Sequence, residues 1–414
     1  MLKNPSILVL NQYYPPDTAV SGLYAAEICA GLAARGFDVH VVAGQPSYTR
    51  PSHDAPARES RDGVRVYRVP MGRARGRERM ARRIAGYLRY LVGAWRTGRK
   101  ILKAGPCSTV LAFSNPPVIG YVGARLAAAG GCRFVWVLHD IHPDVLAVSG
   151  WRLPRLMVWA WEVANRAAFR RAETVVVLSD DMKRTLVERK GVPESKVRVI
   201  PVWGIPEVAP AEHPPGPRDE WGAAEGELLL LTSGNMGVMH PLDEILDAAK
   251  RFADRPVRFV FTGEGVKRRR LEARAAAEKI DRAVFLPRLP DEQLVRLLRA
   301  ADIGLACLHP GLEDLAFPSR LCAYLSAGRP VIAIMNLMSS LTRWIEETGC
   351  GWSVSGGREL EDLVLALLKD PAEIARRGIR ARQVYDDMFQ RAEIIEAYAK
   401  LAGSGLAPAR RSER

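Results

Sequence analysis

The stretch Phe317-Pro318-Ser319-Arg320-Leu321, followed by Ala327-Gly328-Arg329-Pro330-Val331-Ile332-Ala333, says most about this chain. Its pattern predicts a Pro-Ser-Arg turn, a short helix, a Gly-Arg-Pro turn and an apolar strand. A turn that opens a helix leaves backbone N–H groups at the positive end of that helix, which suits an anion such as a diphosphate. We expect Ser319 to cap the helix and Arg320 to add a charge-assisted donor, although an ordinary helix cap alone gives the same pattern.

Apolar strands and helices alternate from one end of the sequence to the other. Strands that are apolar at nearly every position are typical of parallel sheets covered by helices on both faces. Two such series occur, so we predict an α/β protein of two doubly wound, Rossmann-like domains that face each other across a cleft. The expected strands are 7–10, 39–42, 109–113, 134–138, 174–178 and 198–201 in the first series, and 228–232, 258–262, 284–286, 303–306, 331–334 and 352–354 in the second.

Two further segments flank the Pro-Ser-Arg turn. Ala301-Asp302-Ile303-Gly304-Leu305-Ala306 precedes it, and Gly349-Cys350-Gly351-Trp352 follows it. With them, the chain resembles retaining glycosyltransferases of the GT-B fold, family four, and above all the branch that builds bacterial surface polysaccharides. The resemblance runs from about Ile7 to about Leu401. It implies a first domain that binds the acceptor and a second domain that binds a nucleotide-diphosphate sugar as donor.

Composition and resemblance together predict the domain boundaries. We expect an N-terminal acceptor-binding Rossmann-like domain at 1–205 and a proline-rich linker at 206–220. A donor-binding Rossmann-like domain follows at 221–385. The resemblance implies that a helix at 386–402 crosses back to the first domain, and we expect a disordered basic tail at 403–414.

Glycine-rich turns follow several expected strands, where α/β proteins place their ligand contacts. Ser233-Gly234-Asn235-Met236-Gly237 looks like the family's first donor-domain loop, and Thr262-Gly263-Glu264-Gly265 looks like its second turn, which a structural role explains equally well. In the first domain Gly22 stands where relatives often have two glycines, with a helix cap by Ser21 as the alternative. The resemblance thus implies donor contacts by Gly22, Gly234, Asn235, Gly263, Glu264, Arg288, Pro318, Ser319 and Arg320.

The positive charge that a diphosphate needs is not where many relatives carry it. They place Arg and Lys in the first donor-domain loop, whereas Asn235 and His240 stand there in this chain. The resemblance then leaves Arg320, Arg288 or Lys267 to supply the charge.

The acidic residues of the family are also replaced. Relatives commonly carry two glutamates around the Pro-Ser-Arg turn, the second of which holds the ribose of the nucleotide. Leu315 and Ala323 occupy these two positions. Glu313 and Asp314 lie just before the first position and do not coincide with it. The surface-polysaccharide branch can lack the acid, so the difference puts ribose recognition in question and not activity.

The run His139-Asp140-Ile141-His142-Pro143-Asp144 follows an expected strand of the first domain. His139 and Asp140 resemble family residues that line the acceptor side of the cleft, and we expect them to be the catalytic pair. A helix cap by Asp140 or Asp144 is the structural alternative. We expect no metal site, because no second cluster of His or Cys accompanies this run, and no cofactor.

The formal net charge of +14 is concentrated in one segment. Between Met71 and Lys103, Arg and Lys alternate with apolar residues, and Glu78 is the only acid. A basic amphipathic helix of this kind favours an anionic membrane surface, although a helix that packs its apolar face on its own domain shows the same pattern. We expect no nucleic acid partner, since no recognition module accompanies the charge.

The resemblance implies that the chain moves a sugar from a nucleotide-diphosphate sugar to a polyprenyl-diphosphate-linked acceptor, with retained configuration. No apolar run is long enough to span a membrane, and Met-Leu-Lys at the N-terminus leads into a strand. We therefore expect a cytoplasmic protein that is peripheral on the inner face of the cell membrane. Two other classes stay open, a nucleotide-sugar epimerase of the same fold and a non-catalytic nucleotide-sugar-binding protein.

Overall fold

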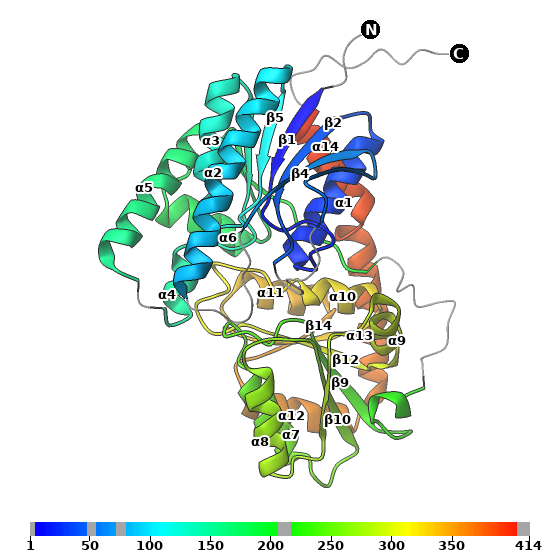
Figure 1. The fold of residues 1–414 in the computed structure, drawn as a ribbon. Coiled ribbons are helices and arrows are strands. Elements are labelled where there is room, and N and C mark those ends of the chain that lie inside the picture. The colour runs from blue at the N-terminus through cyan, green and yellow to red at the C-terminus, as the bar shows by residue number, and fades with distance from the viewer. Residues whose placement is uncertain (1–4, 48–54, 72–79, 152, 206–216, 404–414) are drawn as a thin grey trace, which may run out of the picture.

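A computed structural model describes residues 5–47, 55–71, 80–151, 153–205 and 217–403. The chain forms two β-sheets, one in each half, and helices cover both faces of each sheet (Figure 1). This arrangement confirms the predicted pair of doubly wound α/β domains. Residues 72–79 of the predicted membrane segment, 206–216 of the predicted linker and 404–414 of the predicted tail lie outside the described residues.

The first sheet has eight strands in the order β3-β4-β2-β1-β5-β6-β7-β8. Its strands pair in parallel, except that β3 runs antiparallel to β4. Alternate residues of β1 face opposite cores, because successive side chains of a strand point to opposite sides of the sheet. The strands are β1 Ser6–Leu10, β2 Asp38–Gly44, β3 Arg58–Arg61, β4 Val64–Val69, β5 Thr109–Ala112, β6 Arg133–Val137, β7 Thr174–Val177 and β8 Val197–Val199.

The β3–β4 hairpin is absent from the sequence prediction. Its turn consists of Asp62 and Gly63, with φ of 51° and 76°, which is the left-handed geometry that favours an Asp-Gly pair in a tight hairpin. In β4 the buried side chain of Arg68 is ion-paired to Glu59 of β3, with 2.5 Å between Nη2 and Oε1. The hairpin extends the sheet at the edge farthest from β8.

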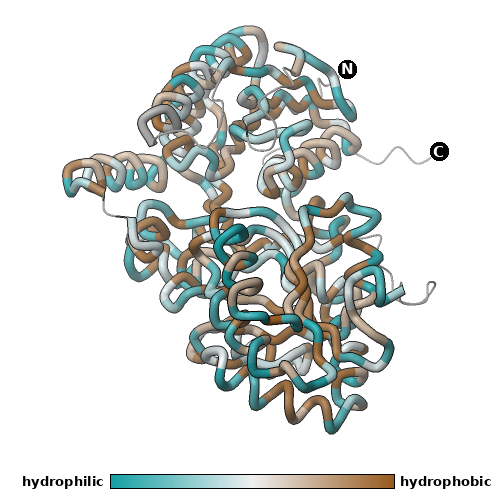
Figure 2. The backbone as a smooth tube through the Cα atoms, turned by 60° about the horizontal axis from the view of Figure 1, so that its bottom comes forward, coloured by the Kyte–Doolittle hydropathy of each residue, from teal (hydrophilic) through white to brown (hydrophobic). Residues whose placement is uncertain are grey.

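The second sheet has six parallel strands in the order β11-β10-β9-β12-β13-β14. Every residue of β9, β12 and β13 is buried, as the unbroken apolar runs predict. Figure 2 shows hydrophobic stretches inside each half and hydrophilic residues on many outer turns. The strands are β9 Leu228–Ser233, β10 Val257–Thr262, β11 Ala283–Leu286, β12 Ile303–Cys307, β13 Val331–Ile334 and β14 Gly351–Val354.

Helices cover both faces of the first sheet. On one face α2, α3 and α5 lie side by side, and on the other α1 packs with α14 (Figure 1). None of the helices in the described ranges combines the length and apolar character needed to span a bilayer. The helices of this half are α1 Val20–Ala34, α2 Met80–Ala104, α3 Ile119–Gly130, α4 Asp144–Val148, α5 Arg155–Arg171 and α6 Asp180–Arg184, which continues into a π-helical turn at Thr185–Arg189.

The end of the chain passes from the second half to the first. Helix α13 packs on α10, whereas the side chains of Ile394 and Tyr398 on α14 share a core with Ile7 of β1. The Thr109 hydroxyl also donates a 3.1 Å hydrogen bond to the Ala402 carbonyl. The helices of this part are α7 Leu242–Arg251, α8 Arg268–Ala277, α9 Asp291–Ala300, α10 Arg320–Ser326, α11 Ser340–Thr348, α12 Gly357–Leu367, α13 Pro371–Met388 and α14 Arg391–Gly403.

Candidate active site

The loops at the carboxyl ends of the parallel strands of both sheets meet between the halves of the molecule. The main chain after β6 pairs with the loop before α10, where Asp140 and Ala316 form an antiparallel bridge. The Ile141 N–H donates to the Leu315 carbonyl at 2.8 Å. These bonds hold the predicted acceptor residues beside the Pro-Ser-Arg turn of the other half.

Arg320 closes the predicted donor loop. It is the first residue of α10, and its Nη2 donates a 3.0 Å hydrogen bond to the carbonyl oxygen of Asn235. Gly234 has a φ of 106°, which a residue with a side chain rarely adopts. Gly263 lies directly against it, because a Cβ on Gly263 would fall 2.0 Å from the Gly234 carbonyl oxygen. The fold thus brings together four of the residues predicted to bind the donor.

The buried phenol of Tyr324 fixes this arrangement, and the sequence analysis did not single it out. Its hydroxyl accepts a hydrogen bond from the Ser233 N–H at 2.9 Å, and it lies 3.2 Å from the Ser233 hydroxyl. The ring packs on Gly304 of β12, where a Cβ would fall 2.1 Å from a ring carbon. Tyr324 lies one turn after Arg320 on α10, so it fastens the helix that carries Arg320 to the strand that leads into Gly234.

The turn before α10 corrects two parts of the sequence prediction. Ser319 occupies the cap position in a helical conformation, with φ −55° and ψ −20°, and its side chain makes no capping hydrogen bond. The N–H groups of Leu321 and Cys322 donate to the carbonyls of Pro318 and Ser319 at 2.9 and 3.1 Å. Tight local bonds therefore occupy backbone donors that the sequence pattern left free for an anion. The Arg320 side chain is the stronger candidate for anion binding.

Further cationic groups surround the same loop. The Lys267 ammonium donates to the His240 carbonyl at 2.6 Å, and His240 Nδ1 lies 2.7 Å from the Cys307 carbonyl. Burial, followed by the Arg320 cation, lowers the pKa of His240 to about 3, so its imidazole is neutral at physiological pH. Burial, and then the charge of Lys267, also lowers the pKa of His309. Of these four side chains, Arg320 and Lys267 therefore supply the positive charge. Arg268 also reaches this site, where its Nη1 donates a 3.0 Å hydrogen bond to the Gly263 carbonyl.

Other predicted donor residues have structural partners. A Cβ on Gly22 would fall 2.9 Å from the Tyr13 carbonyl carbon, so close packing requires a glycine there. The Arg288 guanidinium reaches across to the first half, where it donates to the Thr18 carbonyl at 3.0 Å. The Glu264 carboxylate is ion-paired to Arg268 at 2.8 Å.

Ser21 does not cap a helix, contrary to the alternative considered for this position. Helix α1 begins at Val20, and no side chain caps it. The Ser21 hydroxyl instead accepts a 3.0 Å hydrogen bond from the side-chain amide of Asn115.

The acceptor side is built around His139 and Asp140. The main-chain N–H of His139 donates a hydrogen bond to the Ser114 hydroxyl at 3.2 Å. The imidazole ring of His139 makes edge contacts with the rings of Tyr24 and Phe113, at centroid distances of 6.2 and 5.8 Å. Burial lowers the pKa of His139 to about 4 and raises the pKa of Asp140 to about 6. A neutral imidazole therefore stands next to a carboxyl group whose pKa is raised to about 6. The alternative of a helix cap by Asp140 or Asp144 is wrong, because α4 begins at Asp144 after Pro143 and no side chain caps it.

Each half of the sequence matches a known protein domain. Residues 21–203 match the glycosyl transferase 4-like domain, and residues 217–384 match the domain called glycosyl transferases group 1. The chain is a glycosyltransferase of the GT-B fold.

Several bacterial proteins resemble this glycosyltransferase. It is 23% identical to the putative colanic acid biosynthesis glycosyl transferase WcaI of Escherichia coli (strain K12), over 95% of this chain and 98% of WcaI. It is 27% identical to the probable glycosyltransferase WbjE of Pseudomonas aeruginosa, over 59% of this chain and only 61% of WbjE.

Solved structures share its fold. Sucrose-phosphate synthase from Thermosynechococcus elongatus superposes with a TM-score of 0.76 at 17% identity, covering 97% of this chain and 99% of that one. HepE from Anabaena, in complex with UDP, superposes with a TM-score of 0.68 at 15% identity, covering 96% and 100%.

Carboxylates near the Pro-Ser-Arg turn of the glycosyltransferase have structural partners. The buried Glu313 carboxylate accepts hydrogen bonds from the N–H groups of Gly311 and Asn336, at 2.7 and 2.8 Å. Asp314 is ion-paired to Arg184 and Arg189 of the first half, at 3.3 and 2.9 Å. Within the described ranges, no group of three or more His, Cys, Asp or Glu side chains is arranged to hold a metal ion.

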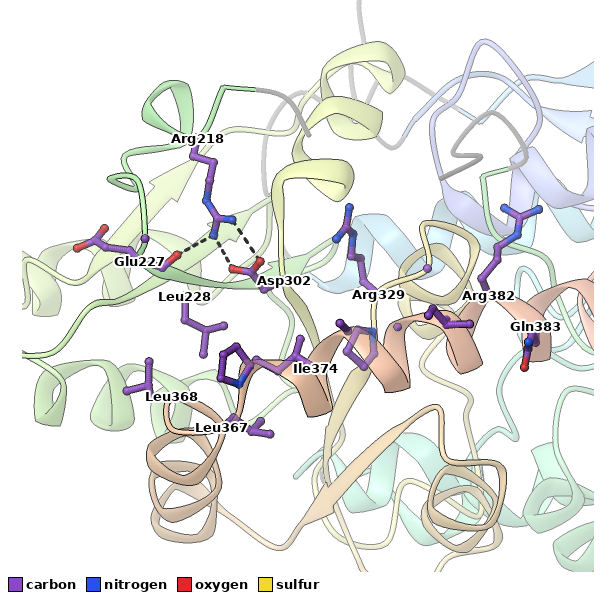
Figure 3. Close-up of a pocket in the computed structure, with 17 residues that line it drawn as sticks. Arg218, Glu227, Leu228, Asp302, Arg329, Leu367, Leu368, Ile374, Arg382 and Gln383 are labelled. Carbon is purple, nitrogen blue, oxygen red and sulfur yellow. Dashed lines mark hydrogen bonds and ion pairs between the residues drawn. The ribbon is translucent and has the colours of Figure 1, made fainter. Parts of the chain in front are cut away.

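The glycosyltransferase also has a cavity of about 720 Å³ in its second half, away from this site. Leu228, Asp302 and Pro330 line it, and they lie at the amino ends of β9, β12 and β13, opposite to the donor loops. Figure 3 shows Arg218 pointing toward Asp302, with Nη2 and Oδ2 2.5 Å apart, above apolar side chains such as Ile374. Ligands of doubly wound sheets bind at the carboxyl ends of the strands, whereas this cavity lies at their amino ends. We therefore exclude it as the donor site.

Proposed function

We propose that this glycosyltransferase moves a sugar, with retained configuration, from a nucleotide-diphosphate sugar to a polyprenyl-diphosphate-linked acceptor in surface polysaccharide synthesis. One observation carries the proposal: the Arg320 guanidinium bonds the Asn235 carbonyl at 3.0 Å, in the half whose Leu315–Ala316 backbone is bonded to the loop of His139 and Asp140. A cationic site for a leaving diphosphate therefore lies close to a polar pair that can meet an acceptor hydroxyl. The similarity to WcaI and the UDP bound to HepE support this assignment.

The charges of the site suit departure of the nucleotide. Breaking the sugar–diphosphate bond develops negative charge on the leaving phosphate and positive charge on the sugar ring. Arg320 and Lys267 would stabilise the phosphate as that charge develops, and the fixed loop around Gly234 would hold it in place. In the retaining mechanism that the resemblance implies, the acceptor hydroxyl attacks from the face of departure and the leaving phosphate takes its proton. Such a mechanism needs no strong general base.

His139 and Asp140 would orient the acceptor hydroxyl. The neutral imidazole can donate or accept one hydrogen bond, and the carboxylate form of Asp140 accepts. The bridge between Asp140 and Ala316 would hold this pair near the donor during the reaction. Orientation of this kind raises turnover more than it raises affinity for the nucleotide.

The polyprenyl acceptor requires access to a membrane. Helix α2 contains Arg and Lys and no acidic residue, which supports peripheral binding to the anionic inner face of the cell membrane. The two glycosyl transferase domain matches do not favour an epimerase or a non-catalytic binding protein.

A transfer assay tests the proposed function. The purified protein is incubated with nucleotide sugars that differ in base and sugar, together with a polyprenyl-diphosphate-linked sugar, and the lipid is analysed by mass spectrometry. The proposal predicts addition of one sugar to the lipid with release of the nucleoside diphosphate. Conversion of the donor into its epimer would assign the chain to the epimerases, and binding of donors without their consumption would assign it to the binding proteins.

A further inference from the structure

The first two turns of α5 are apolar and exposed to solvent. Leu156 and Trp159 keep 74% and 60% of their surface accessible, and Met157 between them is also exposed. Trp151, just before α5, is exposed as well. Large exposed apolar side chains that gather at one end of a helix, and are not scattered singly, are typical of an interaction surface. We call Trp151, Leu156, Met157 and Trp159 the apolar tip.

Neighbouring helices extend this surface. In a parallel sheet, the helix after each strand begins at the carboxyl end of that strand, so α3 starts at the same edge as the active-site loops. The figure places the beginnings of α2 and α5 at this edge as well (Figure 1). Exposed apolar side chains also occur near the starts of α3, which packs on α5, and of α2, which packs on α3. They are Tyr121 on α3, and Ile84 and Leu88 on α2.

The charge around the apolar tip is positive. Helices α2, α3 and α5 carry a single acidic residue, Glu162, whose carboxylate lies 2.6 Å from the Lys190 ammonium. Arg89 of α2 and Arg155 at the start of α5 are exposed. Apolar and aromatic side chains flanked by Arg are the composition that binds an anionic bilayer, because the rings enter the interface while the guanidinium groups stay at the headgroups.

The inner face of α5 connects the apolar tip to the active site. The ring of Trp161 stacks on His142 with a centroid distance of 5.8 Å, and the Asn165 side chain donates to the His142 carbonyl at 2.8 Å. His142 lies three residues after His139. One helix therefore has an apolar outer end and an inner face that supports the acceptor loop.

We propose that the apolar tip inserts into the interface of an anionic lipid bilayer and orients the glycosyltransferase so that its active-site loops lie beside the membrane. The proposal rests on the lipid-linked acceptor of the proposed function. An acceptor anchored in the bilayer then presents its sugar close to His139 and Asp140 without leaving the membrane. The apolar tip lies outside the amphipathic segment Met71–Lys103 that the sequence pattern indicates, to which Ile84 and Leu88 belong.

Vesicle binding by the full-length protein tests this proposal. The double variant Leu156→Ser/Trp159→Ser is compared with wild type and with Ile379→Ser on α13, whose side chain is 66% exposed in the other half. Co-sedimentation is measured with vesicles of phosphatidylglycerol and phosphatidylcholine, and with phosphatidylcholine alone. We expect the double variant to bind anionic vesicles about tenfold or more weakly than wild type, and Ile379→Ser to bind like wild type.

Three results would overturn the proposal. One is unchanged vesicle binding by the double variant, and another is an equal loss in Ile379→Ser. The third is a lipid-free wild type that self-associates in sedimentation velocity while the double variant does not, because the tip would then join two copies of the chain. Transfer of sugar to a polyprenyl-diphosphate-linked acceptor dispersed in detergent, without vesicles, is measured in parallel, since its absence in wild type would contradict the proposed function and leave the vesicle result intact.

Discussion

The N–H of Ile141 donates a 2.8 Å hydrogen bond to the carbonyl oxygen of Leu315, and this bond joins the two halves of the glycosyltransferase. Asp140, one residue earlier, pairs with Ala316, four residues before Arg320. A main-chain link of this kind fixes the position of neighbouring side chains more firmly than a contact between long side chains does. The acceptor pair and the cationic donor site are therefore positioned by the same strip of backbone.

Replacing the acceptor pair should separate turnover from nucleotide binding. His139→Ala and Asp140→Asn are each expected to lower kcat by about 100-fold, because loss of orientation acts on the chemical step. The dissociation constant of the nucleoside diphosphate should stay within about twofold of wild type. Steady-state kinetics with calorimetry checks both values. Equal turnover in wild type and both variants would remove these residues from the acceptor site.

Turnover should fall on the acid side of neutrality. Burial raises the pKa of Asp140 to about 6, so its carboxylate is charged above that pH and becomes protonated below it. Burial lowers the pKa of His139 to about 4, and its ring therefore stays neutral across this range. We expect kcat to decrease as the pH falls through about 6, and the residual kcat of Asp140→Asn to lack this step. The same acid limb in the variant would assign the titration to another group.

The Tyr324 hydroxyl should support both stability and donor binding. Tyr324→Phe leaves the buried Ser233 N–H without its acceptor, which should lower the free energy of unfolding by about 1–3 kcal/mol. Because Ser233 precedes Gly234, the variant should also bind nucleoside diphosphate more weakly. Tyr90→Phe is the matched control, since its buried hydroxyl bonds Val42 in the first half at 2.8 Å. Equal donor affinities in the two variants would contradict a role for Tyr324 in the donor loop.

Much of the fold follows from the strand pattern, because fully buried parallel strands must be apolar throughout. The hairpin of β3 and β4 escaped this reasoning, since β3 reads Arg-Glu-Ser-Arg and lies mostly exposed at a sheet edge. Asp62-Gly63 was the available signal, as this pair favours the left-handed turn that the structure shows.

The site was less predictable than the fold. Gly234, Asn235 and Arg320, which the structure brings together, could be proposed from the sequence because they follow strands or open a helix at the edge where parallel sheets bind ligands. The conformation of Ser319 depends on how α10 packs, so its side chain could not be assigned from sequence. Tyr324 looked like an ordinary core residue, and its role appears only in its hydrogen bond with Ser233 and its contact with Gly304, both distant in sequence.

The donor affinity of Arg320→Ala tests the central claim most directly. Calorimetric titration with UDP, GDP, ADP and dTDP first identifies the nucleoside diphosphate that wild type binds. Loss of a charged hydrogen-bond donor should then weaken binding by about 1.5–3 kcal/mol, or about one to two orders of magnitude in Kd. Arg255→Ala, an exposed arginine before β10 at the opposite end of the sheet, should bind like wild type. An Arg320→Ala protein with the same Kd as wild type would contradict the account.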